Sequence, residues 1–115
     1  GLGDREEELP YDPSTQSFLL PVTNEKLPIK TLDWYIDQHK IMRIDFLKID
    51  AEGFDYKILE GAHNTLKHIS IRYIQYEYWN DRLCFHNLLD SDYVMCYIGS
   101  RNVFCIRKGE KWPRL

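Results

Sequence analysis

The fold is decided by ten residues, Phe46 to Asp55, which read FLKIDAEGFD. Their first half belongs to an apolar run from Ile44 to Ile49 that shows no strict alternation with polar residues. Such a run is typical of a strand covered on both faces, as in a parallel sheet. Two carboxylates and a glycine then lead into a helical pattern, so the stretch predicts the strand–loop–helix unit of an α/β domain.

The helix after this loop is predicted over residues 54–66. Its apolar residues recur with helical spacing and form one stripe, made of Phe54, Ile58, Leu59, Ala62 and Leu66. Gly61 lies within this helix at a cost of about 1 kcal/mol relative to alanine, and we therefore expect it to mark close packing on the sheet.

Further elements are predicted on both sides of this unit. Asp33 is the expected N-cap of a short upstream helix. Gly99 lies in a four-residue connection between the last two strands, which predicts an antiparallel hairpin. The predicted strands are 29–32, 71–78, 93–98 and 103–106, and the predicted helices are 34–39 and 80–89.

The order of these elements predicts an α/β domain with a mostly parallel sheet and a C-terminal antiparallel hairpin. Residues 1–28 hold four of the five prolines. They are expected to form a loose N-terminal segment, with one short strand at 17–20. The 115 residues suffice for one small domain.

Composition gives no reason to expect nucleic acid or an anionic membrane as the main partner, because the net charge is −3 with both signs mixed along the chain. Apolar stretches are too short to span a membrane, and no signal-peptide pattern is present. These features favour the cytoplasm without fixing a compartment. The first residue is not Met, so we expect a processed, tagged or trimmed chain.

The cysteines and histidines do not indicate a cross-linked or zinc-binding protein. Cys84, Cys96 and Cys105 are odd in number and lack CxxC spacing, which argues against a disulfide framework and a structural zinc site. Cys96 and Cys105 lie in strand-like runs and are expected to be small buried hydrophobes. The four histidines show no metal-ligand spacing and are interpreted as structural or surface residues.

Candidate site residues follow two of the predicted strands. Asp50 and Glu52 lie between a strand and a helix, where open α/β sheets bind ligands. Gly53 permits a sharp turn or a close ligand approach. Glu77 ends the next strand, so the three carboxylates converge if the two strands are neighbours. They could attract a cationic ligand, act as general base, or bind Mg²⁺ or Ca²⁺, and the sequence does not choose among these uses.

Each of these carboxylates also has a purely structural interpretation. Asp50 or Glu52 could simply cap the helix that follows. Glu77 could be a rim residue facing water, since glutamate is rarely buried without a partner.

Several segments together resemble the FkbM family of methyltransferases. They are Thr31-Leu32-Asp33, the run from Ile44 to Gly53, Leu59-Glu60-Gly61-Ala62, and a following strand that ends in Glu77. Order and spacing agree over about residues 29–79, and the resemblance extends weakly over the terminal hairpin. Gly1-Leu2-Gly3-Asp4 is similar to the turn that precedes the TLD segment in that family.

The resemblance implies a Rossmann-like methyltransferase fold whose seven-stranded sheet ends in an antiparallel strand. It implies methyl transfer from S-adenosylmethionine, typically to a hydroxyl oxygen of a sugar or natural product. By position, Asp50, Glu52 and Glu77 would be catalytic, Asp50 and Gly53 would bind the cofactor, and Lys48 could orient a carboxylate or simply extend into water.

The glycine-rich donor loop of the family has no counterpart in this sequence. Residues 29–115 would therefore form the C-terminal half of the domain, a partial Rossmann-like fold that is expected to be inactive alone. Its expected partners are a small-molecule acceptor and the N-terminal half of the domain, in the same or another chain. Two alternatives are a non-catalytic interaction domain and a divalent-metal site with other chemistry.

Overall fold

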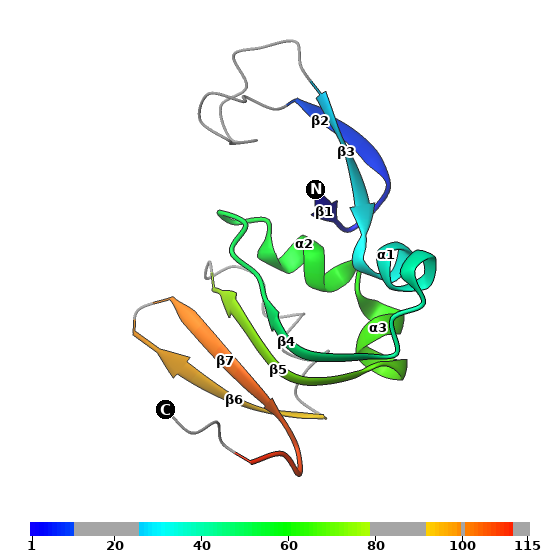
Figure 1. Ribbon diagram of the computed structural model, residues 1–115. Coiled ribbons are helices and arrows are strands. Elements are labelled where there is room, and N and C mark those ends of the chain that lie inside the picture. The colour runs from blue at the N-terminus through cyan, green and yellow to red at the C-terminus, as the bar shows by residue number, and fades with distance from the viewer. Residues whose placement is uncertain (11–25, 79–91, 100, 112–115) are drawn as a thin grey trace.

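The structure is a computed structural model, and it describes residues 1–10, 26–78, 92–99 and 101–111. Its larger sheet has four strands, β4 (Arg43–Lys48), β5 (Ser70–Glu77), β6 (Tyr93–Ile98) and β7 (Asn102–Arg107), in the order β4-β5-β7-β6 (Figure 1). β4 and β5 pair in parallel, whereas β7 is antiparallel to both of its neighbours. β4, β5 and β6 therefore run in one direction.

The antiparallel hairpin of β6 and β7 confirms the sequence prediction, but the sheet is mixed rather than mostly parallel in its pairing. β7 does not lie at the edge: it is inserted between β5 and β6. The interior strand is accordingly the more buried one: Val103 and Cys105 of β7 are fully buried, whereas Val94 and Tyr97 of β6 are 48% and 64% exposed. Composition does not account for this order, because every residue of β6 is apolar whereas β7 carries Asn102 and Arg107 at its two ends.

A second, smaller sheet is formed by β1 (Leu2–Gly3), β2 (Glu7–Pro10) and β3 (Lys26–Thr31), in the order β1-β3-β2. β3 pairs in parallel with β1 and antiparallel with β2. Residues 1–28 were expected to be loose, and the described part of that segment is instead largely strand. The strand predicted at 17–20 lies outside the described residues.

Three helices lie between the small sheet and the four-stranded sheet in Figure 1: α1 (Leu32–His39), α2 (Asp55–Glu60) and α3 (His63–His68). α1 was expected to be capped by Asp33, but Thr31 is the N-cap, and its hydroxyl oxygen accepts from the backbone N–H of Trp34 at 3.0 Å. The helix predicted at 80–89 lies outside the described residues.

The single helix predicted over 54–66 is wrong, because the chain breaks at Gly61 and Ala62 into α2 and α3. The carboxylate of Asp33 explains the break. It accepts from the backbone N–H of Asn64 at 3.0 Å and of Thr65 at 2.7 Å, and also from the Thr65 hydroxyl at 2.7 Å. Asp33 thus caps the start of α3 from another helix and satisfies N–H groups that would otherwise lack partners.

Gly61 marks close packing, as predicted, but its neighbour is β1 rather than the four-stranded sheet. A Cβ atom at Gly61 would overlap the carbonyl oxygen of Gly3, which no rotation of a side chain can relieve. The Gly61 carbonyl in turn accepts from the backbone N–H of Asp33 at 3.1 Å. Gly61 therefore holds the α2–α3 junction against both β1 and the start of α1.

The main core lies where the helices pack on β5 and β7. One buried cluster joins residues of α1, α2, the α2–α3 junction, α3 and the sheet, among them Leu32, Ile36, Ile58, Leu59, Ala62, Leu66, Ile71, Ile74, Tyr76, Val103 and Cys105. β4 was expected to be covered on both faces, and this is wrong, because it forms the edge of the described sheet and four of its six residues, including Phe46, are exposed.

Candidate functional site

The carboxyl ends of β4 and β5 lie side by side, as the candidate site requires. Lys48 stands opposite Gln75 in the parallel register, and the backbone N–H of Ile49 donates to the carbonyl of Gln75 at 2.8 Å. Asp50 follows at once, and Glu77 is the last residue of β5. The two strands are therefore neighbours, which is the condition on which convergence of the three carboxylates depends.

A tight turn carries Asp50 and Glu52 into solvent at this edge. The N–H of Phe54 donates to the carbonyl of Ala51 at 3.0 Å, and both central residues have positive φ, 50° at Glu52 and 92° at Gly53. This pattern is that of a type I′ turn, which favours glycine, asparagine or aspartate. Glu52 therefore adopts a conformation that costs a residue with a side chain about 1 kcal/mol. Asp50 and Glu52 are both exposed, and Glu77 is half-buried.

Gly53 occupies the second of these left-handed positions, where glycine has no steric penalty. A Cβ atom at this position would meet nothing within 4 Å. The backbone of Gly53 is therefore open on the side where another residue would carry its side chain.

Asp55 is the buried carboxylate of this region, with only 1% of its surface exposed. Its Oδ1 accepts from the N–H of Ala51 at 2.9 Å, and its Oδ2 accepts from the N–H of Glu77 at 2.8 Å. One side chain thus joins the turn after β4 to the end of β5. Asp55 was not among the predicted site residues, since it falls outside the apolar stripe of the helix. The signal that could have found it is the presence of three carboxylates, Asp50, Glu52 and Asp55, within six residues.

The structure contradicts the interpretation of Asp50 and Glu52 as simple helix caps. Phe54 is the N-cap of α2, and no side-chain cap bond is made there. Both carboxylates are instead left at the surface of the edge. We call Asp50, Glu52 and Glu77 together the carboxylate rim.

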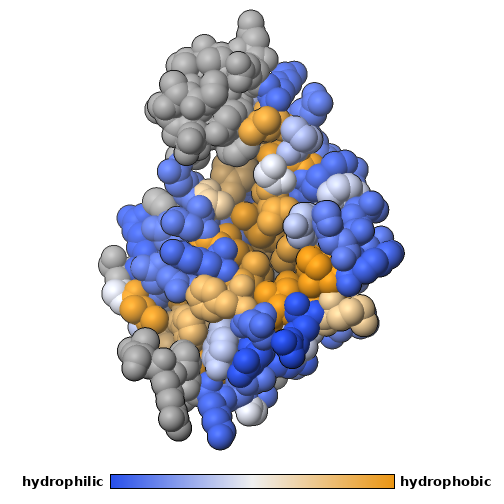
Figure 2. Space-filling view, viewed as in Figure 1, coloured by the Kyte–Doolittle hydropathy of each residue, from blue (hydrophilic) through white to orange (hydrophobic). Residues whose placement is uncertain are grey.

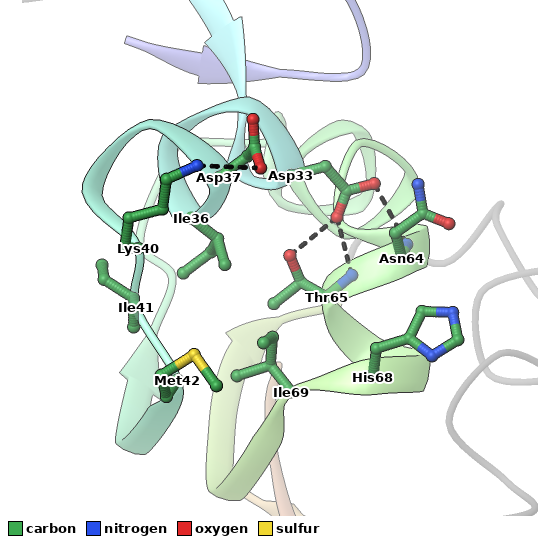
Figure 3. A pocket seen from close by; sticks show the side chains of 10 residues that line it. All are labelled: Asp33, Ile36, Asp37, Lys40, Ile41, Met42, Asn64, Thr65, His68 and Ile69. Carbon is green, nitrogen blue, oxygen red and sulfur yellow. Dashed lines mark hydrogen bonds and ion pairs between the residues drawn. The ribbon is translucent and has the colours of Figure 1, made fainter.

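Two hollows lie elsewhere in the described part of the chain. The first, of about 370 Å³, opens between α1 and α3 (Figure 3) and is lined by Asp33, Ile36, Asp37, Lys40, Ile41, Met42, Asn64, Thr65, His68 and Ile69. Met42 and Ile69 immediately precede β4 and β5, so this hollow lies at the amino ends of the strands, opposite the carboxylate rim.

The second hollow, of about 530 Å³, is mostly apolar and lies beside β1 and the start of α1. Trp34 and Lys30 contribute to its lining, with the Lys30 ammonium 5.0 Å from the centre of the Trp34 ring. Neither hollow includes a residue of the carboxylate rim.

Comparison with known proteins assigns the family. The methyltransferase FkbM domain matches residues 7–92, which is more than half of the chain. This chain belongs to the FkbM methyltransferase family. No curated protein and no solved structure matches it. The matched range contains the TLD segment, the turn after β4 and Glu77, and it ends before the β6–β7 hairpin.

The residues of the TLD segment of this FkbM domain stabilise its fold. Thr31 caps its own helix, Leu32 is buried in the core, and Asp33 caps α3. The segment thereby fixes how α1 meets the α2–α3 junction, at a distance from the carboxylate rim along the chain. These contacts give the TLD segment a role in folding, and none of them involves a residue of the carboxylate rim.

The FkbM domain shows no sign of a metal centre in its described residues. Among residues 1–10, 26–78, 92–99 and 101–111, no group of three or more His, Cys, Asp or Glu side chains could hold a metal ion. Cys105 is buried as predicted, and burial raises the pKa of its thiol to about 12, whereas Cys96 is half-buried. Cys84 lies outside the described residues.

No helix in the described part of the FkbM domain is long and apolar enough to cross a lipid bilayer. Lys48, which was expected either to orient a carboxylate or to extend into water, is exposed.

Proposed function

We propose that this chain supplies the acceptor side of an S-adenosylmethionine-dependent O-methyltransferase that acts on a hydroxyl group of a sugar or natural product. The observation that carries the proposal is the carboxylate rim, which follows two adjacent parallel strands at the end where α/β sheets bind ligands. Membership of the FkbM family supports methyl transfer as the reaction class.

The rim residues would act on the acceptor hydroxyl. Asp50, Glu52 and Glu77 offer carboxylate oxygens that can accept a hydrogen bond from the hydroxyl and take its proton as the oxygen gains the methyl group. Exposure of Asp50 and Glu52 leaves them reachable by a substrate. S-adenosylmethionine, when bound, supplies the electrophilic methyl group.

Asp50 and Gly53 are the residues of this chain that would contact the cofactor. The open side of the Gly53 backbone and the exposure of Asp50 leave room for a ligand at this edge, so these residues fit the group. The glycine-rich donor loop would come from the N-terminal half of the domain, in the same or another chain, and this chain alone would then be inactive.

One edge and part of one face of the sheet are exposed, which supports the proposal that an N-terminal half packs there. β4 ends the described sheet on one side, so its outer backbone groups face no neighbouring strand there. Phe46, Tyr73 and Phe104 lie near one another on the sheet, with ring centres 6.2 Å apart for Phe46 and Phe104 and 5.9 Å apart for Tyr73 and Phe104. Apolar groups also reach the surface across the middle of the view in Figure 2.

Calorimetric titration of this chain with S-adenosylhomocysteine tests the division into halves, once circular dichroism shows that the chain folds. We expect no binding, because the amide donors of the glycine-rich loop are needed to hold the cofactor. Binding at micromolar strength would show that a donor site exists within these residues, and the fragment proposal would be wrong.

A non-catalytic interaction domain is the second candidate, and the exposed edge of β4 with its neighbouring aromatic rings favours it. The coding sequence upstream of this chain separates the two. An intact glycine-rich loop after a strand would favour the enzyme, and its loss would favour the interaction domain.

A further inference from the structure

We propose that Asp55 is a positioning residue, whose buried carboxylate holds the ends of β4 and β5 in the arrangement that the carboxylate rim needs. The inference rests on the proposed function for its catalytic consequence. Its structural basis is independent of that function, because the two hydrogen bonds of Asp55 join residues that are 26 positions apart, Ala51 and Glu77.

The hydrogen bonds of Asp55 lie where the β4–β5 ladder ends. The N–H of Ile49 donates to the carbonyl of Gln75, which is the regular parallel pattern. In a continuing parallel ladder the N–H of Glu77 would next donate to the carbonyl of Ile49. It donates instead to Asp55 at 2.8 Å. A side-chain carboxylate therefore replaces a backbone carbonyl at the point where the two chains begin to diverge.

Asp55 is 1% exposed, and both of its oxygens accept from backbone N–H groups. Hydrogen bonds to an ionised group are shorter and stronger than neutral ones, and a buried partner left without one is strongly disfavoured. The carboxylate thus holds both N–H groups firmly.

Asp55 also acts on the turn that carries part of the carboxylate rim. Ala51 begins the turn in which Glu52 adopts a φ of 50°. A residue with a side chain keeps such a conformation only when its surroundings enforce it, and such residues concentrate at functional sites. The bond from Ala51 to Asp55 anchors the turn on one side, and the bond from Phe54 to Ala51 closes it. Asp55 thereby sets the directions of Asp50 and Glu52 relative to Glu77.

The direct test is amide hydrogen exchange of this chain, followed by NMR. In the unmodified chain we expect the amides of Ala51 and Glu77 to be protected, and the amide of Gly53 to exchange faster. In Asp55→Asn, only one side-chain oxygen can accept, so at least one of the two amides should exchange about tenfold faster or more. Asp37→Asn, an exposed change on α1, should leave both amides unaltered.

Equal, fast exchange of the Ala51, Gly53 and Glu77 amides in the unmodified chain would overturn the inference without any variant. This measurement also decides the matter if Asp55→Asn does not fold. Asp55→Glu then serves as the milder variant, since it keeps both oxygens but moves them by one methylene group, and its exchange should change at the same two amides.

The catalytic consequence is measured in a protein that joins this chain to the N-terminal half. We expect Asp55→Asn to lower kcat about a hundredfold per folded molecule, because small misplacements of reacting groups have effects of that size. A purely structural role would reduce the folded fraction and leave kcat per folded molecule unchanged, which would overturn the positioning role. If the unmodified protein transfers no methyl group, the proposed function fails, and amide exchange still decides whether Asp55 holds the two strand ends.

Discussion

Asp50 is the residue on which the proposed chemistry depends most directly. It is exposed, and it neither caps α2 nor belongs to the core, so the fold does not need its charge. In a protein that joins this chain to the N-terminal half, we expect Asp50→Asn to abolish turnover. Its free energy of unfolding should change by less than about 1 kcal/mol, as is usual at exposed positions. Methyl-transfer assays and chemical denaturation measure the two quantities.

The matched control for Asp50 is Asp37→Asn, because Asp37 is also exposed and its ion pair with Lys40 on the surface of α1 contributes little. This control should retain both turnover and stability. An Asp50→Asn protein with full activity would remove Asp50 from the rim.

Sequence reasoning at the residue scale identified the exposed carboxylates and missed the buried one. Asp50 and Glu52 were recognisable from their place between a strand and a helix. Asp55 was not, because its importance depends on the N–H of Glu77, which lies 22 residues further along the chain. Asp33 was misassigned for the same physical reason, since the N–H groups that it caps belong to residues 31 and 32 positions away.

At the scale of elements, α3 depends on a side chain from another helix. Asp33→Ala removes three hydrogen bonds at the start of α3, two of them from backbone N–H groups. We expect a loss of about 2 kcal/mol in the free energy of unfolding, at the upper end of values for N-cap removal. Asp33→Asn should lose less, because its amide oxygen can still accept. Chemical denaturation of the chain measures both, and equal stability of Asp33→Ala and the unmodified chain would contradict the cap.

The break between α2 and α3 could not be predicted from periodicity. The apolar stripe continues through Gly61 without interruption, so the pattern favours one helix. The break follows from contacts made by other elements: β1 approaches too closely for a side chain at Gly61, and Asp33 offers a cap one turn later. The glycine itself was a correct signal of close packing, but the sequence did not say against what.

At the scale of the whole molecule, the parallel β4–β5 pair and the β6–β7 hairpin were predictable, and the arrangement between them was not. A hairpin fixes which two strands pair with each other, yet either could have joined β5. In the structure β7 joins β5, although β6 (YVMCYI) is the more apolar of the two in sequence, and Val103 and Cys105 of β7 are fully buried there. β4 forms the other edge of the described sheet whichever strand of the hairpin joins β5, because β5 is its one neighbour there.

The exposed part of the sheet at β4 is where we expect the N-terminal half to pack. Phe46 is 46% exposed here, so Phe46→Lys should cost this chain less than about 1 kcal/mol. If the N-terminal half packs on this part of the sheet, Phe46 becomes buried in the joined protein. The same substitution there should cost about 3 kcal/mol or more, because it would bury an unpaired charge.

Chemical denaturation of both proteins, with and without the substitution, gives the comparison. Met42→Lys is the control, because Met42 is 80% exposed and precedes β4 at the far end of the strand from the rim, so its cost should be small in both proteins. An equally small cost of Phe46→Lys in the two proteins would mean that the N-terminal half leaves this face uncovered. The exposed sheet would then stay available to another partner, as the interaction-domain alternative requires.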